Sequence, residues 1–359
     1  MSANKGEWSE LLALATILNA GQIELGSVQK RIAPKIEIKP FDVLGAALPA
    51  EPATAVSSFE IEGEFVNLFA GGRSVGRVSR REIARHIPEL YRDIQNGSPN
   101  GSRTFDSAAG HEIKTLLQLQ TLGSKVENFD LLLDVKVDEL TKPERLGFSI
   151  KSEIGGAWTL LNASGLTNFE YELDHHELSP EALVLPHDEK SVNKNVQSLI
   201  ESGWRFGFVE IQPSGRSGST FQENLRDIDP RFPALLAKAV LAFYGTEKNK
   251  FLDIVDDVAK GEDDPEMVID LFHEFMIRKL QGLVAGTPYR EPGIPLGGIL
   301  YVRPNGKVET SPILDTHSIA YDLMSQLKFE RPDRRNKFGS LIRRRGKIYL
   351  NLNLQLRKG

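Results

Sequence analysis

The chain has 359 residues, a formal net charge of −5 and 40% hydrophobic residues. This length is long for one domain and predicts either a core with additions or two lobes, with enough apolar residues to bury a core. The absence of cysteine excludes disulfides, thiolate zinc sites and a cysteine nucleophile. No apolar run is long enough to span a membrane, and the N-terminal region is not typical of a signal peptide. We therefore expect a cytoplasmic protein without membrane contacts.

The N-terminal residues predict an amphipathic helix. Asn4 can act as its N-cap, with Glu7 as the reciprocal partner of a capping box, and Gly21 is expected to end it. The apolar stripe consists of Trp8, Leu11, Leu12, Ala15 and Leu18. Glu10 lies on another face, beside apolar residues, where a carboxylate is unusual unless it binds something. Glu10 is therefore a candidate site residue, and a surface ion pair is the alternative.

Residues 23–103 predict a mixture of short strands and turns that ends in an amphipathic helix over 79–94. A second helix is expected over 108–123. Neither segment carries a pattern specific enough to assign chemistry to it. The adjacent pair His111 and Glu112 does not place two ligands on one helical face, so we expect surface residues there.

Residues 129–152 predict two β-strands joined by a turn, and this hairpin is the most informative feature of the sequence. Apolar and polar residues alternate through 131–138, which is typical of a half-buried strand. Pro143 interrupts the alternation, because its ring fixes φ and it cannot donate to a strand ladder. The alternation then resumes in the second strand.

The polar side of this hairpin brings together residue types that suit phosphate chemistry. Asp130 and Asp134 share the polar side of the first strand, and Ser149 and Lys151 share that of the second. In a hairpin these faces can coincide and place one or two carboxylates beside a lysine. That combination suits a hard divalent cation and a cationic group near a phosphate. The alternative is a hairpin whose polar face is simply solvated.

Two later segments carry candidate polar contacts. The first is the loop after the hairpin, whose hydrogen-bonding residues include Asn162, Thr167 and Asn168. Turn chemistry explains such residues well, but their position directly after the hairpin favours a loop that contacts phosphates or bases. The second follows a strand over 204–212 and a Gly/Ser loop, and it contains Asn224 and Arg226. Farther on, Asn305-Gly306 predicts the turn of another hairpin.

The C-terminal residues 331–359 are strongly basic, with ten lysines and arginines against one aspartate, whereas the rest of the chain is acidic. Such asymmetry predicts a surface that contacts phosphates, and a solvated stretch without specific function is the alternative. Alternation over 348–356 predicts that the cluster adjoins an ordered strand. The candidate contacts are Arg335, Arg343, Arg344, Arg345 and Lys347.

Taken together, four stretches of the sequence resemble type II restriction endonucleases of the HpaII family, in their order and in their spacing. They are NKGEWSELLALATILNAG, the hairpin running into GGAWTLLNASGLTNFEYEL, PLGGILYVRPNGKV and YLNLNLQLRKG. The resemblance covers most of the chain and is weak over 23–103. It implies an α/β fold with a PD-(D/E)XK restriction-endonuclease-like core, a central mixed β-sheet flanked by helices, and additional DNA-binding elements.

The resemblance also implies a domain organisation. We expect a nuclease core over 1–215, with an inserted β/α lobe at about residues 30–103. Residues 216–359 are expected to form a helical segment and a C-terminal basic β region that binds DNA.

In function, the resemblance implies sequence-specific, Mg2+-dependent hydrolysis of double-stranded DNA that leaves 5′-phosphate ends, with a GC-rich target such as CCGG. A palindromic target favours a homodimer, and a cognate DNA methyltransferase would be its genetic partner. Two alternatives remain: a structure-selective repair nuclease with the same core, or a DNA-binding protein with an inactive core. The sequence has no phosphate loop of the GxxxxGK type and no paired-histidine motif, so it gives no support to a function outside nucleic acids.

Carried onto this sequence, the resemblance assigns roles to the hairpin. Asp130 matches the first acidic position and Lys151 the lysine, while Lys5-Gly6 followed by Glu10 resembles a first-helix glutamate that points into the metal site. Ser149 stands where the superfamily usually has a second carboxylate, so another acid must complete the site. Glu10 is the first choice for that acid, with Glu153, Glu170 and Asp134 behind it, and Asp134 is also the alternative to Asp130 as the main metal ligand. The expected catalytic group is Asp130, Lys151, Ser149 and Glu10, with Mg2+ held by Asp130, Glu10 and Asp134.

Overall fold

In the computed structural model the chain divides into two compact units. The structure describes residues 2–26, 41–48, 55–97, 104–123, 128–136, 142–178, 183–185, 191–212, 219–311, 315–332 and 338–359. The first unit consists of Met1–Trp158, Leu280–Gly282 and Glu291–Asp322, and the second of Thr159–Lys279, Leu283–Arg290 and Leu323–Gly359. This division does not follow the boundary expected at residue 215. Residues 159–215 belong to the C-terminal unit, and a late segment returns to the N-terminal one.

The first unit is built on a mixed sheet of nine strands. In sheet order these are β2 (Gln22–Leu25), β14 (Val308–Thr310), β13 (Leu296–Val302), β9 (Glu144–Ser152), β8 (Leu131–Lys136), β3 (Phe41–Ala47), β4 (Val56–Glu62), β5 (Phe65–Ala70) and β6 (Arg73–Ser79). β13 runs parallel to β9, and β14 parallel to β2. Because β2 also pairs with β3, the first six strands close into a barrel-like ring rather than an open sheet. The mixed α/β class is confirmed, and the ring closure was not predicted.

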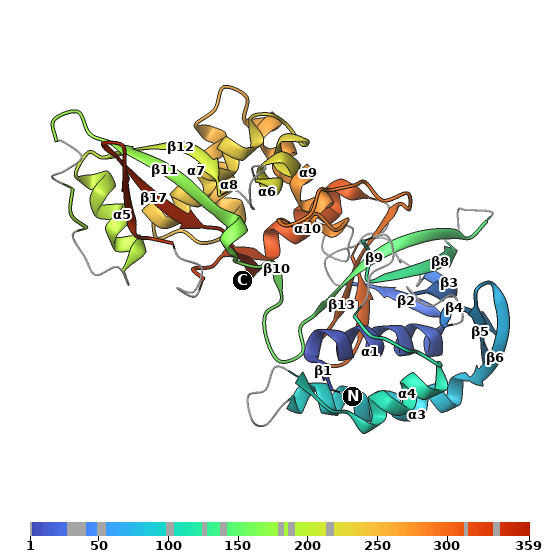
Figure 1. Ribbon diagram of the computed structural model, residues 1–359. Coiled ribbons are helices and arrows are strands. Elements are labelled where there is room, and N and C mark those ends of the chain that lie inside the picture. Colours follow the sequence, from blue (N-terminus) through green and yellow to red (C-terminus); the bar gives the residue numbers. More distant parts are fainter. Residues whose placement is uncertain are drawn as a thin grey trace. The chain divides into compact units, whose positions relative to one another are not determined.

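Among the described residues, three helices accompany this sheet: α1 (Lys5–Ala20), α3 (Arg80–Asn96) and α4 (Ala108–Leu116). Figure 1 shows α1 between the strands and the other two helices. The predicted capping box is confirmed, because Glu7 N–H donates to Asn4 Oδ1 at 3.0 Å and Asn4 N–H donates to Glu7 Oε2 at 2.7 Å. Gly21 ends α1 in the left-handed conformation, φ 65°. Strands β1 (Ala3–Asn4) and β7 (Thr104–Phe105) form a separate pair.

The predicted hairpin is confirmed as β8 and β9. The two strands pair antiparallel, with Leu131 opposite Phe148. Leu131, Leu133 and Val135 are fully buried and join one hydrophobic cluster with α1. Alternation thus places one side of the hairpin in the core, as the sequence predicts. The Asn305-Gly306 turn is also confirmed, since it joins β13 to β14 with Gly306 at φ 81°.

The described residues of the second unit form two antiparallel sheets. The larger contains, in order, β12 (Arg205–Ile211), β11 (Asn168–Asp174), β17 (Lys347–Asn353) and β16 (Leu341–Arg344). The smaller contains β10 (Thr159–Leu161), β18 (Leu356–Lys358) and β15 (Leu327–Phe329). The C-terminal alternation therefore does predict a strand, although it is divided between β17 and β18.

The described helices of the second unit are α5 (Val192–Glu201), α6 (Thr220–Arg226), α7 (Phe232–Gly245), α8 (Phe251–Lys260) and α9 (Pro265–Leu280), together with the short 3-10 helix η1 (Gly165–Thr167). Helices α6 and α7 contact the larger sheet, whereas α5 and α8 contact α7. Tyr171 Oη donates to the Ala237 carbonyl at 2.7 Å, which fastens β11 to α7. A further helix, α10 (Thr316–Gln326), crosses the division between the units. Within the described parts of the chain, no helix is both long and apolar enough to cross a bilayer.

Candidate active site

Asp130 lies immediately before β8, at the point where β8 and β9 stop pairing. Its N–H donates to the Phe148 carbonyl at 3.0 Å, and its Oδ2 accepts the Ile150 N–H at 2.8 Å. The carboxylate thus accepts the Ile150 N–H. If the two strands continued to pair, a backbone carbonyl would accept it instead. Because Asp130 stands outside the strand, its side chain does not have to follow the alternation of β8. The carboxylate is fixed in position and is only 7% exposed.

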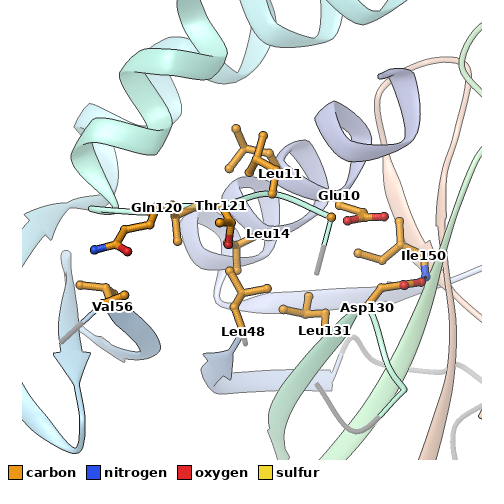
Figure 2. Close-up of a pocket in the computed structure, with 14 residues that line it drawn as sticks. Glu10, Leu11, Leu14, Leu48, Val56, Gln120, Thr121, Asp130, Leu131 and Ile150 are labelled. Atoms are coloured by element: carbon orange, nitrogen blue, oxygen red, sulfur yellow. Dashed lines mark hydrogen bonds between the residues drawn. The ribbon is translucent and has the colours of Figure 1, made fainter. Parts of the chain in front are cut away.

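Asp130 and Glu10 line one pocket, which is partly open to solvent. Figure 2 shows both carboxylates at the same end of this pocket, next to Ile150. The remainder of the lining is mainly apolar and includes Leu11, Leu14, Leu48, Val56 and Leu131. Two oxygen-rich side chains from different elements therefore converge at one end of a mostly apolar pocket. Such a donor pair suits a hard cation such as Mg2+.

The segment 119–123 forms another wall of the pocket. The sequence predicted helix through residue 123, but α4 ends at Leu116. Gln118 adopts φ 53°, a conformation that does not continue a right-handed helix. Lys114 Nζ then donates to the Gln120 carbonyl at 3.2 Å, which holds the following segment against the end of α4. The early end of the helix frees these residues to line the pocket.

Ser149 and Lys151 occur on the other side of β9. Ile150 belongs to the core cluster that contains α1, and alternation directs its two neighbours away from that cluster. Ser149 is buried, and its hydroxyl donates to the Leu280 carbonyl at 3.3 Å. Lys151 stands opposite Tyr301 of β13. Neither residue is among the described residues that line the pocket. The structure thus brings Glu10 to Asp130, and it places Lys151 one residue beyond the Ile150 N–H that binds Asp130.

The other carboxylates considered as metal ligands each pair with an arginine. Asp134 is held by Arg145 through two hydrogen bonds of 2.7 and 2.8 Å, and Asp134 does not line the pocket. This hydrogen bond to Asp134 raises the pKa of the Arg145 guanidinium. Glu153 and Glu170 have equivalent partners, which are Arg303 at 3.0 Å and Arg344 respectively. Arginine pairing accounts for all three carboxylates without a metal ion.

Two of the expected DNA contacts in the loop after the hairpin are buried. Thr167 and Asn168 are 0% and 1% exposed. Asn353 Nδ2 donates to Asn168 Oδ1 and, at 2.7 Å, to the Ser164 carbonyl, which ties this loop to β17. Burial and hydrogen bonds between this loop and β17 therefore explain the polar side chains of Thr167 and Asn168 without a contact to DNA. Asn162, by contrast, is exposed.

Asn224 is 2% exposed, and it makes three hydrogen bonds to one loop. Its amide donates to the Val284 and Thr287 carbonyls at 3.1 and 2.9 Å, and its Oδ1 accepts the Tyr289 N–H at 2.8 Å. These three hydrogen bonds indicate that the Asn224 side chain supports the loop of residues 284–289. Arg226, at the end of α6, is exposed.

The basic cluster of the C-terminal region forms the β16–β17 hairpin. Arg345 and Gly346 adopt φ 50° and 73° in its two-residue turn, which fits the type I′ geometry that matches strand twist. Arg344 pairs with the buried Glu170, and its guanidinium lies 4.0 Å from the centre of the Tyr349 ring. Lys347 pairs with Glu172 at 2.8 Å.

The remaining members of the cluster differ in environment. The Arg343 guanidinium donates to the Leu183 carbonyl. Arg345 is exposed at the tip of the turn. Arg335 lies outside the described residues. Part of the positive charge predicted to face DNA is therefore neutralised by acidic residues of β11, while Arg345 at the turn is exposed.

Sequence reasoning missed Asp322 in α10. Its side chain is 1% exposed, and Tyr301 Oη donates to its Oδ2 at 3.0 Å. The available signal was a carboxylate inside the apolar run IAYDLM, which is the kind of signal that identified Glu10. No sequence motif connected that position with the hairpin.

Comparison with known proteins gives a consistent result over the full length of the chain. The family model described as HpaII restriction endonuclease matches residues 4–358. The chain is 24% identical over 375 residues to "Type II restriction enzyme HpaII" of Haemophilus parainfluenzae, with 99% of this chain and 98% of that protein covered. No solved structure matches the chain at a significant level.

Proposed function

The chain belongs to the HpaII restriction endonuclease family, and we therefore propose that it is a type II restriction endonuclease that hydrolyses double-stranded DNA at a specific sequence. The observation in the structure that supports this activity is the pocket in which Glu10 and Asp130 converge. Carboxylates supply the hard oxygen donors that a divalent cation prefers, and two of them meet at one end of this pocket. The hairpin that holds Asp130 also carries Lys151.

We propose Mg2+ as the cofactor, held by Glu10 and Asp130. Both supply hard oxygen donors, and Mg2+ in phosphate chemistry commonly takes one or two carboxylates together with water and the substrate. Bound there, Mg2+ would supply Lewis-acid chemistry at the scissile phosphate. Asp134 ranks below Glu10 as a ligand because Arg145 already binds both of its oxygens.

The protein's own groups have distinct tasks in this proposal. The Ile150 N–H fixes the orientation of the Asp130 carboxylate, at 2.8 Å. The proposal requires the Lys151 ammonium to reach the phosphate from the side of β9 that faces away from the pocket; there it would orient the attacking water and neutralise negative charge that develops on the phosphate. Water oxygen bonds to phosphorus, the bond from phosphorus to the 3′ oxygen breaks, and the 3′ oxygen receives a proton. The products then carry 5′-phosphate and 3′-hydroxyl ends.

DNA binding in this proposal uses the turn of the β16–β17 hairpin and exposed polar groups. Arg345 at the turn is suited to a phosphate contact, and Arg226 and Asn162 are the exposed members of the other candidate segments. We propose a CCGG-like target, a homodimer that matches the symmetry of a palindromic site, and a cognate DNA methyltransferase.

The contribution of the turn can be tested by comparing two neighbouring arginines. For Arg345→Ala we expect weaker DNA binding and a slope of log K against log salt that is lower by about 1, as for one lost phosphate contact. For Arg344→Ala we expect a loss of about 1 kcal/mol in unfolding free energy, because Glu170 stays buried without its partner. Binding titrations at several salt concentrations and denaturant melts measure the two effects. A salt slope that stays unchanged in Arg345→Ala would remove the turn from the interface.

Incubation with unmethylated phage DNA, with Mg2+ or with EDTA, tests the proposed activity directly. We expect discrete fragments with Mg2+ and intact DNA with EDTA, and sequencing of the fragment ends gives the site. A smear would instead indicate a structure-selective or nonspecific nuclease. Intact DNA that shifts on a native gel would indicate a binding protein without cleavage, for which Ser149 in place of a carboxylate offers a reason.

A further inference from the structure

The hairpin of β5 and β6 lies at the end of the nine-stranded sheet and concentrates positive charge. Residues 65–81 contain four arginines and no acidic residue, in a chain whose net charge is −5. Arg80 fixes the base of the hairpin, because its guanidinium donates to the Asn19 carbonyl at 2.8 Å and to the Gly63 carbonyl at 2.8 Å. The hairpin is therefore a positively charged element that is anchored to the end of α1.

The tip of this hairpin lies beside the wall of the pocket, within the same compact unit. Val56 lines the pocket and pairs with Ala70, which in turn pairs with Arg73 across a two-residue turn. Directly opposed residues share one face of a sheet. Because neighbouring strands are about 4.8 Å apart, Arg73 begins about 10 Å from Val56 on the face that lines the pocket. Figure 2 shows Val56 at the end of the pocket away from Glu10 and Asp130.

An irregularity in β6 separates Arg73 from the next arginine of the strand. The register between β5 and β6 shifts at Val75, which is left without a partner in β5. Such a β-bulge changes the alternation of side chains along the strand. Arg77 consequently lies on the opposite face from Arg73, and its guanidinium is 4.2 Å from the centre of the Phe65 ring. The bulge thus directs one arginine to the pocket side of the sheet and the other to the far side.

The turn itself is open to another molecule. Gly71 and Gly72 adopt φ 54° and 78°, as a type I′ turn requires. Both glycines and Arg73 are exposed, and a Cβ at Gly72 would meet nothing within 4 Å. Arg73 takes part in none of the ion pairs among the described residues. A polyanion can therefore approach the turn closely and find a guanidinium there that no carboxylate neutralises.

We propose that Arg73, at the Gly71-Gly72 turn, binds a backbone phosphate of the same DNA whose scissile phosphate lies at Glu10 and Asp130. The guanidinium presents a planar fork of donors that fits two phosphate oxygens. A DNA strand carries a phosphate about every 3.4 Å along the helix axis, so a duplex at the pocket has further phosphates beyond the pocket's far end. Such a contact sets the register of the duplex without reading bases. The inference rests on the proposed function only in taking DNA as the substrate of the pocket.

Binding titrations at several salt concentrations, without Mg2+, test this contact independently of cleavage. The probe is a short duplex that contains CCGG. For Arg73→Gln we expect weaker binding and a slope of log K against log salt that is smaller in magnitude by about 1, as for one lost phosphate contact. Arg73→Lys is expected to restore the slope, because it keeps the charge. The exposed position predicts an unchanged melting temperature for both variants.

Arg77→Gln is the matched control for these titrations. It removes the same charge from the same strand, on the face turned away from the pocket, so its salt slope is expected to equal that of the wild type. An unchanged slope in Arg73→Gln would overturn the proposal. An equal reduction in Arg77→Gln would overturn it too, since the effect would then come from net charge rather than from a contact.

Neutral methylphosphonate linkages, placed one at a time along the same duplex, locate the contacted phosphate. We expect one linkage outside the scissile position to weaken binding by the wild type and by Arg77→Gln to the same extent. The same linkage is expected to have little effect on Arg73→Gln, because both changes remove one interaction. Losses that multiply at every linkage would show that Arg73 binds none of these phosphates.

The titrations separate failure of this inference from failure of the proposed function. A wild-type protein that binds the duplex and never cleaves DNA would refute the nuclease assignment, and the salt slopes would still decide whether Arg73 contacts a phosphate. A wild-type protein that cleaves DNA, together with an unchanged slope in Arg73→Gln, would refute the contact alone. A wild-type protein that binds no DNA would refute both.

Discussion

Replacement of Asp130 by asparagine is expected to abolish Mg2+-dependent DNA cleavage and to leave both the fold and DNA binding intact. The amide oxygen of asparagine can still accept the Ile150 N–H, which Asp130 now binds at 2.8 Å. The negative charge beside Glu10 is lost, however, and with it a cation ligand. We expect the cleavage rate to fall by at least about 100-fold. Cleavage of a plasmid substrate measures the rate, and a gel shift without Mg2+ measures binding.

Asp134→Asn is the matched control, because Asp134 belongs to the same hairpin and pairs with Arg145 outside the pocket. It is expected to keep its cleavage rate within a few-fold of the wild type. If Asp134→Asn were inactive and Asp130→Asn active, the metal site would move to Asp134. Lys151→Ala is expected to resemble Asp130→Asn, with cleavage lost and DNA binding retained. Full activity in both Asp130→Asn and Lys151→Ala would refute the site as a whole.

The parts of the fold that the sequence predicted correctly are those specified by contacts between near neighbours in the chain. The Asn4 capping box joins residues three apart, and the Asn305-Gly306 turn joins adjacent strands. The hairpin of 129–152 was predicted because alternation and Pro143 are local signals. For the same reason, the face of β8 that is buried was predicted correctly.

The parts that were missed depend on partners far away in sequence. Alternation indicates which face Glu153 or Glu170 occupies, but it does not show that an arginine about 150 or more residues later binds it. Closure of the ring likewise requires β2 to pair with the distant strand β14, where Glu24 lies beside Glu309. The same limit applies to Asp322, which approaches β13 only after the chain has folded. Glu10 was predicted as a site residue because a carboxylate among apolar residues is anomalous by itself, and the structure places it at one pocket with Asp130.

Gly147→Ala is expected to damage stability and cleavage together, because this glycine sets the packing beneath the site. A Cβ at Gly147 would lie 2.2–2.4 Å from three atoms of the Phe129 ring, which is fully buried. No adjustment of a surface side chain relieves such an overlap, so Phe129 must move. Phe129 is bonded to Asp130, whose N–H binds Phe148. We expect a loss of about 1–3 kcal/mol in unfolding free energy, typical of overpacking, and a lower cleavage rate.

Chemical denaturation and plasmid cleavage, measured on the same preparations, test this expectation. Gly207→Ala serves as the control in another strand, because a Cβ there would meet nothing closer than 3.9 Å.

The overlap itself is tested by adding Gly147→Ala to Phe129→Ala. With the ring absent, the added methyl group is expected to cost little further stability, so the two losses are not additive. Additive losses would show that the glycine acts through the backbone of β9 rather than through Phe129. In that case Phe129 would not be the residue that holds Asp130 in place at the open end of the β8–β9 hairpin.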